Sequence, residues 1–514
     1  MSEEAAPLDL RLVPAAATGW AVTAAGIQWH TAAAVLVLLA GVAATAGVAV
    51  WGSTEATVAA ALRSAGAGVA AVAVLGGAFT LAVTVRADHV EHHPIVTRYG
   101  STAAVVVTPG DSPRPIRGGR VMFRGVLHSI DGRPSSGRVV VFASAHGFSD
   151  VNAGRPAAFR ARIGEPTRRD LSVAVLSATG EATVGTAAAP QRMAQHIRTG
   201  FADAARGVLP VEQAAMLPAL VLGDTAAVPP DTAADFRTSG LTHLTAVSGA
   251  NVTIVCGAVL LSAALVGPRA AVVLAALALI VFVVVVQPEA SVLRAAVMGA
   301  ITLLAMVTPR RRQAIPALAA SVLVLLTVAP ELAVDAGFAL SVAATAGLVV
   351  IAPVWSRRMT ARGWPKPVAD AVGIALAAQV VTAPLVAGIS GRVSLVSVLA
   401  NVVVAPVIPP ITVIGTAAAA LCQLWPAGAG LLIRFTGPLL WWLLRVAGWA
   451  AGVPGASVSV PSGWAGVAAV ALGGIGLVVL WRWRWVRVVA GAALLCLVAW
   501  TVSGHAALGG VGAA

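Results

Sequence analysis

Hydrophobic stretches of about membrane length follow one another along most of the chain. Three of them lie near the N-terminus, at residues 13–30, 31–50 and about 66–85. Ten more follow, at 241–266, 269–287, 290–308, 314–329, 331–355, 368–389, 393–420, 429–453, 464–481 and 488–503. Apolar runs of this length are typical of transmembrane helices. The pattern therefore predicts a polytopic α-helical membrane protein.

Residues 95–188 follow a different pattern, with short and mostly β-branched runs separated by Gly, Pro and Asp. The expected strands are 103–108, 120–127, 138–142, 159–163 and 171–176. So many short strands in one segment favour a small β-barrel, and we expect an OB-like domain. If the N-terminus is cytoplasmic and three helices cross the membrane before it, this domain is extracytoplasmic.

These patterns divide the chain into four parts. They are N-terminal transmembrane helices (1–94), the OB-like β domain (95–188), an amphipathic linker (189–240) and a C-terminal transmembrane domain (241–514). In the linker, Met193, Ile197, Phe201 and Ala204 recur at helical spacing with cationic residues opposite. This spacing predicts a helix that lies along the membrane surface.

The composition supports the membrane assignment, since 58% of the residues are hydrophobic and 11% are charged. The net charge of +13 comes from arginine, because Lys366 is the only lysine in the sequence and lies between two prolines. A phosphate-binding P-loop is therefore excluded, and an ATP-driven motor would be a separate protein. The three cysteines, Cys256, Cys422 and Cys496, fall in apolar runs and are expected to be buried, with no disulfide framework.

The arginine clusters predict the orientation of the helices. Residues 310–312, 357–358 and 482–487 carry them, and even numbers of predicted spans separate one cluster from the next. All three clusters then lie on one side of the membrane, which the positive-inside tendency makes the cytoplasmic side. Residues 95–200, which are the OB-like domain and the start of the linker, have fourteen arginines against six acidic residues. This charge fits contact with a polyanion such as single-stranded DNA or with anionic lipid, and it also fits a domain kept soluble by arginine.

A polar cluster in Gly240–Ile254, called here the signature segment, leads directly into a hydrophobic run. His243, Thr245, Ser248 and Asn251 are about three residues apart, so one helix would place much of this polarity along one side. Polar groups at membrane depth are costly unless they face protein or water. The segment therefore predicts a polar seam inside a helical bundle.

Other polar residues interrupt the apolar runs further along. Arg294 would cost about 2.5–3.5 kcal/mol at a membrane centre, and we expect Glu289, Asp335, water or a passing phosphate to compensate for its charge. The uncharged Ser341, Gln379 and Asn401 fit either a polar conduit or ordinary hydrogen bonds between helices. Prolines at 384 and at 406–410 are expected to break helices on either side of Asn401.

The signature segment closely resembles that of the ComEC competence proteins, whose usual form reads G-L-x-H-L-L-A-x-S-G-L-H-V. Here Ala250-Asn251 replaces the usual Leu-His. Further matches occur in the order of the family, at 219–224, 235–240, 291–298, 337–345, 378–379, 394–401 and 406. The resemblance covers about 95–420 and implies a DNA-uptake channel that carries single-stranded DNA into the cytoplasm. Because the chain has no H-x-H-x-D-H motif, the metallo-β-lactamase-like domain of many ComEC proteins is expected to be absent.

The resemblance and the polar pattern together suggest site residues. A DNA path is expected to include His243, Ser248, Asn251, Arg294, Asp335, Gln379 and Asn401, and the outer domain is expected to bind DNA through Arg160, Arg162, Arg168 and Arg169. The expected partners are single-stranded DNA, the lipid bilayer of the cell membrane, a DNA receptor and a motor, with a homo-oligomer left open. No cofactor and no catalytic residue is expected. The acidic and histidine-rich run 88–93 is interpreted as a solvated linker rather than a metal site.

Two other functions fit parts of the pattern. An intramembrane serine hydrolase would use Ser248 as nucleophile, but His243 is poorly placed to meet it on a regular helix. A small-molecule secondary transporter would also use broken helices and buried charge, and an internal repeat would favour it. No convincing repeat is visible in the sequence.

Overall fold

The computed structural model describes residues 9–51, 58–116, 118–245, 247, 249–263, 267–287, 290–307 and 314–480. The chain forms two compact units. One comprises residues 1–229, 243–349 and 407–440, and the other comprises 230–242, 350–406 and 441–514. Each unit is described separately.

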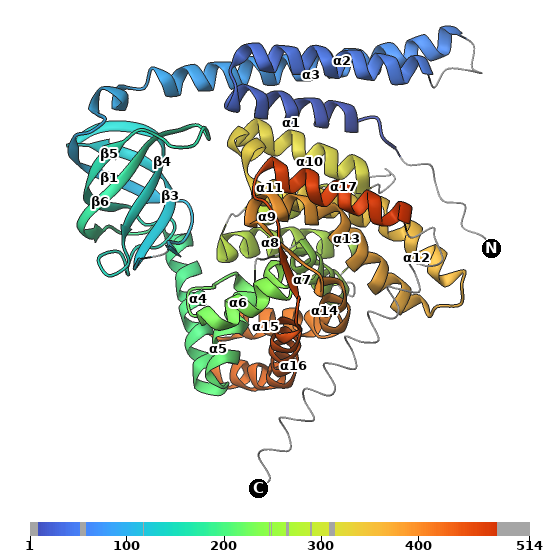
Figure 1. The fold of residues 1–514 in the computed structure, drawn as a ribbon. Helices are drawn as coiled ribbons and strands as arrows, with labels where there is room; N and C mark the ends of the chain where they lie inside the picture. Colours follow the sequence, from blue (N-terminus) through green and yellow to red (C-terminus); the bar gives the residue numbers. More distant parts are fainter. Residues whose placement is uncertain are drawn as a thin grey trace. The chain divides into compact units, whose positions relative to one another are not determined.

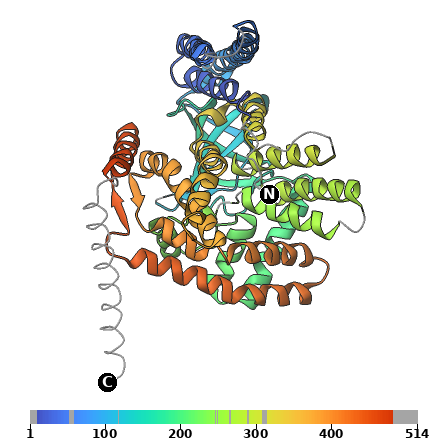
Figure 2. The ribbon, with the colours of Figure 1, turned by 90° about the vertical axis from the view of Figure 1, so that its right-hand side faces the viewer.

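The first unit begins with three apolar helices that lie side by side (Figures 1 and 2). They are α1 (Val13–Gln28), α2 (Thr31–Trp51) and α3 (Val58–Glu91). The short link between α1 and α2 requires an unusual backbone at His30, whose φ is +108°. All three predicted N-terminal hydrophobic runs thus form helices, and α3 extends well beyond the expected 66–85.

A small barrel follows, and its strands are short and alternate between buried and exposed residues, as the sequence predicts (Figure 1). The strands are β1 (Thr102–Pro109), β2 (Arg114–Ile116), β3 (Arg120–Ile130), β4 (Arg133–Ser144), β5 (Ala157–Gly164) and β6 (Ser172–Val184). Strands β1-β5-β6-β4-β3 are hydrogen-bonded in this order, and pairing of β3 with β1 closes the barrel. Strand β2 pairs only with β3. The prediction of a small β-barrel is confirmed, and five strands form its closed wall.

Aromatic side chains fill the barrel core. Phe123, Phe148 and Phe159 are 0%, 2% and 5% exposed, and their rings contact one another. Phe142 is the exception, because it lies on an outward-facing position of β4 and is only partly buried. It is therefore the one of these four rings that remains open to an external ligand.

The other helices of the first unit all bury apolar side chains. They are α4 (Ala189–Val208), α5 (Val211–Leu222), α7 (Gly249–Ser262), α8 (Pro268–Val286), α9 (Ala290–Val307), α10 (Ala314–Val328), η4 (Pro330–Val334), α11 (Ala336–Val350) and α15 (Ile408–Leu421). The amphipathic linker helix was expected to place its cationic side opposite the apolar stripe. This expectation is wrong in detail, because Arg198 is buried in α4 while Met193 is 64% exposed.

The second unit contains a short helix and a larger group built on α13. Its elements are α6 (Pro230–Thr238), α12 (Ala352–Thr360), α13 (Lys366–Ser390), β7 (Arg392–Ser394), α14 (Ser397–Val404), β8 (Ser457–Ser459) and α17 (Trp464–Leu480). Helix α13 packs against α12, α14 and α17, and β7 pairs with β8. The helix α16 (Pro426–Gly452) contributes residues to both units and is continuous (Figure 2).

Five helical stretches among the described residues are long and apolar enough to cross a membrane. They are Gly68–Arg98, Pro268–Val286, Ala336–Thr360, Lys366–Ser390 and Pro426–Gly452. Other predicted runs form shorter apolar helices such as Asn251–Ser262 and Ala314–Val328. The described residues therefore contain fewer full-length spans than the hydrophobic pattern predicts.

The predicted proline breaks have two different outcomes. The chain is interrupted between Val404 at the end of α14 and Ile408 at the start of α15, as expected. The break expected at Pro384 is wrong, because α13 continues through this residue. A single internal proline removes one backbone hydrogen bond, and an apolar helix packed among neighbours tolerates that loss.

Candidate functional site

Arg294, in α9, is the centre of the candidate site. The residue is 5% exposed, and its Nε donates a hydrogen bond to Ser341 Oγ of α11 at 2.8 Å. One of its terminal nitrogens lies 3.3 Å from the sulfur of Met298. Among the described residues, no carboxylate oxygen lies within 4.0 Å of this guanidinium. Burial of an unpaired ion costs several kcal/mol of desolvation free energy. The burial of this arginine is therefore unfavourable unless another group interacts with its charge.

The signature segment is not a single helix. Residues Thr242–Leu244 form a 3-10 turn, η2, and regular helix α7 begins only at Gly249. The predicted helical seam from His243 to Asn251 is therefore wrong for its first half. Serine and threonine side chains can bond to nearby backbone groups in place of the helical hydrogen bonds, which favours irregular turns of this kind. His243 is exposed in η2, and Ser248 lies outside the described residues.

Helix α9 lies against the signature segment. The hydroxyl of Ser291 donates to the carbonyl of Val247 at 3.0 Å. A Cβ atom at Gly249 would lie 3.5 Å from a terminal nitrogen of Arg294, so the guanidinium lies directly beside the first residue of α7. The positive end of the α7 dipole and a buried cation are therefore adjacent.

Asn251 connects this group to the end of α5. Its side chain is 5% exposed, and its amide nitrogen donates to the carbonyl of Leu220 at 3.0 Å. Side-chain hydrogen bonds thus connect sequence segments 219–224, 243–254, 291–298 and 337–345 in the first unit. The predicted DNA path includes residues of the second and third of these segments, and these two segments are in contact in the structure.

Asp335 has a different environment from the one expected. Its Oδ1 accepts a hydrogen bond from the backbone N–H of Phe338 at 2.9 Å, which caps the start of α11. Its Oδ2 lies 3.3 Å from a terminal nitrogen of Arg124 in the barrel. Asp335 therefore pairs with Arg124 rather than with Arg294. Glu289, the other acidic residue considered for that pairing, lies outside the described residues.

Gln379 and Asn401 belong to a second polar group, in the second unit. The amide of Gln379 donates to the carbonyl of Ser394 at 3.2 Å, and that of Asn401 donates to the carbonyl of Ser397 at 2.8 Å. Gly240, at the start of the signature segment, packs on the same two serines. A Cβ there would lie 2.5 Å from Ser397 Oγ, and φ is +76°, so only glycine fits this position.

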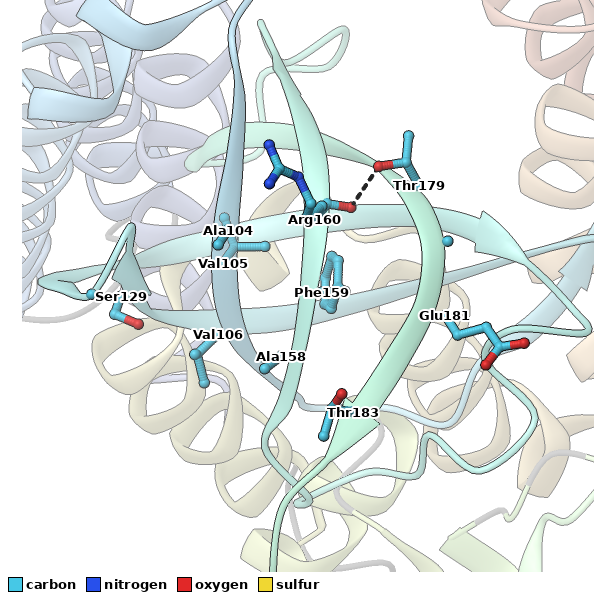
Figure 3. A pocket seen from close by; sticks show the side chains of 12 residues that line it. Ala104, Val105, Val106, Ser129, Ala158, Phe159, Arg160, Thr179, Glu181 and Thr183 are labelled. Carbon is cyan, nitrogen blue, oxygen red and sulfur yellow. Dashed lines mark hydrogen bonds between the residues drawn. The ribbon is translucent and has the colours of Figure 1, made fainter.

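The four barrel arginines expected to bind DNA are all exposed but do not form one cluster. Arg160 and Arg162 lie two residues apart on the outer side of β5. Figure 3 shows Arg160 at a shallow groove of about 510 Å³, pointing away from the buried Phe159 ring. Arg168 lies in the loop between β5 and β6. Arg169 in the same loop donates to the carbonyl of Gln28 at 3.2 Å, so it attaches the barrel to α1.

Three arginines that the sequence pattern does not single out make specific contacts. Arg198 donates to the carbonyls of Leu222, Val285 and Val286, at the C-terminal ends of α5 and α8, and lies 3.4 Å from a carboxylate oxygen of Asp224. Arg124 pairs with Asp335, and Arg138 pairs with Glu331. A signal for Arg198 was present, because it shares the buried stripe of α4 with Ala194, Phe201 and Ala205.

Two carboxylates moderate the positive charge of the barrel. Burial raises the pKa of Asp111, although a hydrogen bond from the backbone N–H of Arg124 at 2.8 Å opposes that shift. The pKa of Asp131 is lowered, first by the backbone N–H of Ala104 and then by the guanidinium of Arg98. Asp131 is therefore a stable anion on the barrel surface at neutral pH.

The histidine-rich run 88–93 covers the end of α3 and the two residues before η1 (Pro94–Arg98). His92 lies 3.1 Å from Asp88 and His93 lies 2.6 Å from the carbonyl of Ser136, so these side chains bind protein groups. Within the described ranges, no group of three His, Cys, Asp or Glu side chains is arranged to hold a metal ion.

Comparison with known proteins gives one match. No curated protein and no solved structure matches the chain. A family model described as Competence protein matches residues 220–485, which is more than half of the chain. The match begins at the end of α5 and includes the signature segment, Arg294, Ser341, Gln379 and Asn401. The chain therefore belongs to the Competence protein family.

Proposed function

We propose that this protein is a channel that carries single-stranded DNA across the cytoplasmic membrane during natural transformation. Membership of the Competence protein family suggests a role in DNA uptake. The five long apolar helices are compatible with a multi-pass membrane protein. DNA would enter from the side of the barrel, and a separate ATP-driven protein would supply the driving force, because the chain has no P-loop lysine.

The buried guanidinium of Arg294 carries this proposal. It lies beside the first residue of α7, where backbone N–H groups have no partner within their own helix. An arginine and a helix N-terminus both favour an anion, and a phosphate group accepts hydrogen bonds from both. A passing DNA phosphate would compensate for the cost of burying this charge, and it would do so only during transport.

The test separates DNA passage from DNA capture. In cells that take up labelled DNA, Arg294→Gln should reduce internalised DNA strongly while surface-bound DNA stays unchanged. Arg294→Lys keeps the charge but loses the planar fork of donors, so an intermediate effect is expected. Arg434→Gln, which changes an exposed arginine in the apolar helix α16, is the matched control and should be normal.

Protein levels in the membrane must be equal before the variants are compared. Normal internalisation by Arg294→Gln would contradict the proposal. If Ser248→Ala were at the same time as inactive as a deletion, a hydrolase with Ser248 as nucleophile would explain the data better.

A further inference from the structure

One face of the barrel combines arginines with an open aromatic ring. On β3 and β4 the outward positions include Arg120, Arg124, Arg138 and Phe142, because Val121, Phe123, Val139 and Val141 point inward. The register places Arg124 opposite Val140 and Arg138 opposite Val126, so the two arginines are diagonal neighbours. Strand β2 adds Arg114 opposite Met122. We call these residues of β2, β3 and β4 the β3–β4 face.

The chemistry of this face suits a single strand of nucleic acid. The guanidinium carbon of Arg120 lies 5.6 Å from the centroid of the Phe142 ring. Positively charged side chains interleaved with an accessible aromatic ring are the usual elements of single-strand binding. The corresponding pair of strands is also the ligand face of OB folds. This face is distinct from β5 and the β5–β6 loop, where Arg160 and Arg168 lie.

Two carboxylates from the helical part of the same unit hold arginines of this face. Asp335 lies 3.3 Å from Arg124, and Glu331 pairs with Arg138. The side chains of Arg124 and Arg138 remain 47% and 43% exposed, whereas those of Asp335 and Glu331 are 20% and 14% exposed. The carboxylates thus cover one side of each guanidinium, and the other side stays open to solvent.

A guanidinium binds a carboxylate and a phosphate through the same fork of N–H donors. We propose that Glu331 and Asp335 occupy phosphate positions of a single-stranded DNA site on the β3–β4 face, so that DNA and these carboxylates compete for Arg124 and Arg138. This inference rests on the proposed function. It adds a specific site and a regulatory contact, because the barrel binds DNA fully only when it releases η4 and the start of α11.

The test uses the full-length protein in nanodiscs of zwitterionic lipid and a fluorescent oligodeoxythymidine. The decisive variant is Glu331→Gln with Asp335→Asn, which removes both negative charges. Asparagine at 335 keeps an oxygen that can accept the Phe338 N–H, so the cap of α11 is preserved. The charge-matched control is Asp203→Asn with Glu212→Gln, two exposed positions on α4 and α5.

The quantity measured is the slope of log K against log salt concentration. In the decisive variant, Arg124 and Arg138 are free of the carboxylates and can each bind one further phosphate. This should steepen the slope by about 1.4, since each phosphate contact with a single strand contributes about 0.7. Adding Arg124→Gln and Arg138→Gln to the decisive variant should abolish the gain. The control variant should keep the wild-type slope.

Each other outcome has a defined meaning. An unchanged slope in the decisive variant, with oligonucleotide binding intact, would overturn the competition but leave the proposed function standing. An equal increase of the slope in the control variant would show a general effect of net charge and would also overturn the competition. If the variant gained affinity only for vesicles of anionic lipid, the face would be a lipid site. Absence of oligonucleotide binding by every variant would count against both proposals.

Discussion

Ser341 Oγ accepts a hydrogen bond from Nε of Arg294 at 2.8 Å, and this contact sets the direction of the buried guanidinium. The two residues lie on α11 and α9, in two of the segments that resemble the competence family. The orientation of the charge therefore depends on the packing of two helices.

Loss of this hydroxyl should impair both stability and transport. Ser341→Ala leaves a buried charged group without one of its acceptors, which should cost about 1–3 kcal/mol of unfolding free energy. Internalised DNA should fall while surface-bound DNA stays constant. The control is Thr345→Ala, one turn later on α11, where the hydroxyl donates to the carbonyl of Ser341. If the two variants behave alike in uptake, the contact with Arg294 has no specific role.

Gly240 should tolerate no side chain. Gly240→Ala forces an L-residue to a φ of +76°, which costs about 1–2 kcal/mol, and it also places a Cβ 2.5 Å from Ser397 Oγ. Gly363→Ala isolates the first effect, because φ is +90° there and no atom lies within 4 Å of a Cβ. Thermal unfolding in detergent should show a larger loss for Gly240→Ala. Equal losses would mean that the serine does not oppose the substitution.

Arg198 should be important for folding and not for DNA contact. Arg198→Met removes the guanidinium that pairs with Asp224 and donates to three helix-end carbonyls, which should destabilise the protein by roughly 2–4 kcal/mol, allowing for the partial exposure of Asp224. Adding Asp224→Asn should restore part of the loss, since the stranded charge is then removed. No recovery in the double variant would show that the carbonyl contacts dominate.

The orientation in the membrane is tested by labelling single cysteines in a cysteine-free background. Arg133→Cys is at the exposed start of β4, and Arg362→Cys is in the exposed loop after α12. We expect an impermeant maleimide to label position 133 in intact cells and position 362 only after permeabilisation. Labelling of both positions from the same side would contradict three crossings before the barrel.

Local patterns in the sequence were sufficient for the barrel and for most helices. Alternation of β-branched and polar residues located the strands, and long apolar runs located α8, α13 and α16. Arg294 stood out because a cation inside an apolar run is unusual. The sequence also indicated that the segment at 243–251 belongs near it, by resemblance rather than by physical pattern.

The remaining features depend on contacts between distant parts of the chain. Asp335 precedes a helix in the sequence and was considered as a partner for Arg294. Its carboxylate instead pairs with Arg124, which lies on a strand more than 200 residues earlier. Periodicity shows which side chains face outward, and it does not show which of them meet. The start of α7 at Gly249 could not be predicted from local sequence either. The carbonyl of Val247, just before it, accepts a hydrogen bond from Ser291 of the distant helix α9.

Helix α11 carries contacts to two arginines, Arg124 of β3 and Arg294 of α9. Asp335 caps its beginning and binds Arg124, while Ser341, about 9 Å further along the axis, accepts the hydrogen bond of Arg294. A helix of this length moves as a stiff rod, so a small rotation about its axis displaces both contacts together. The contact with the barrel and the contact with the interior guanidinium are thus only six residues apart on one stiff segment. We therefore expect a DNA strand that displaces Asp335 from Arg124 also to change the orientation of Arg294.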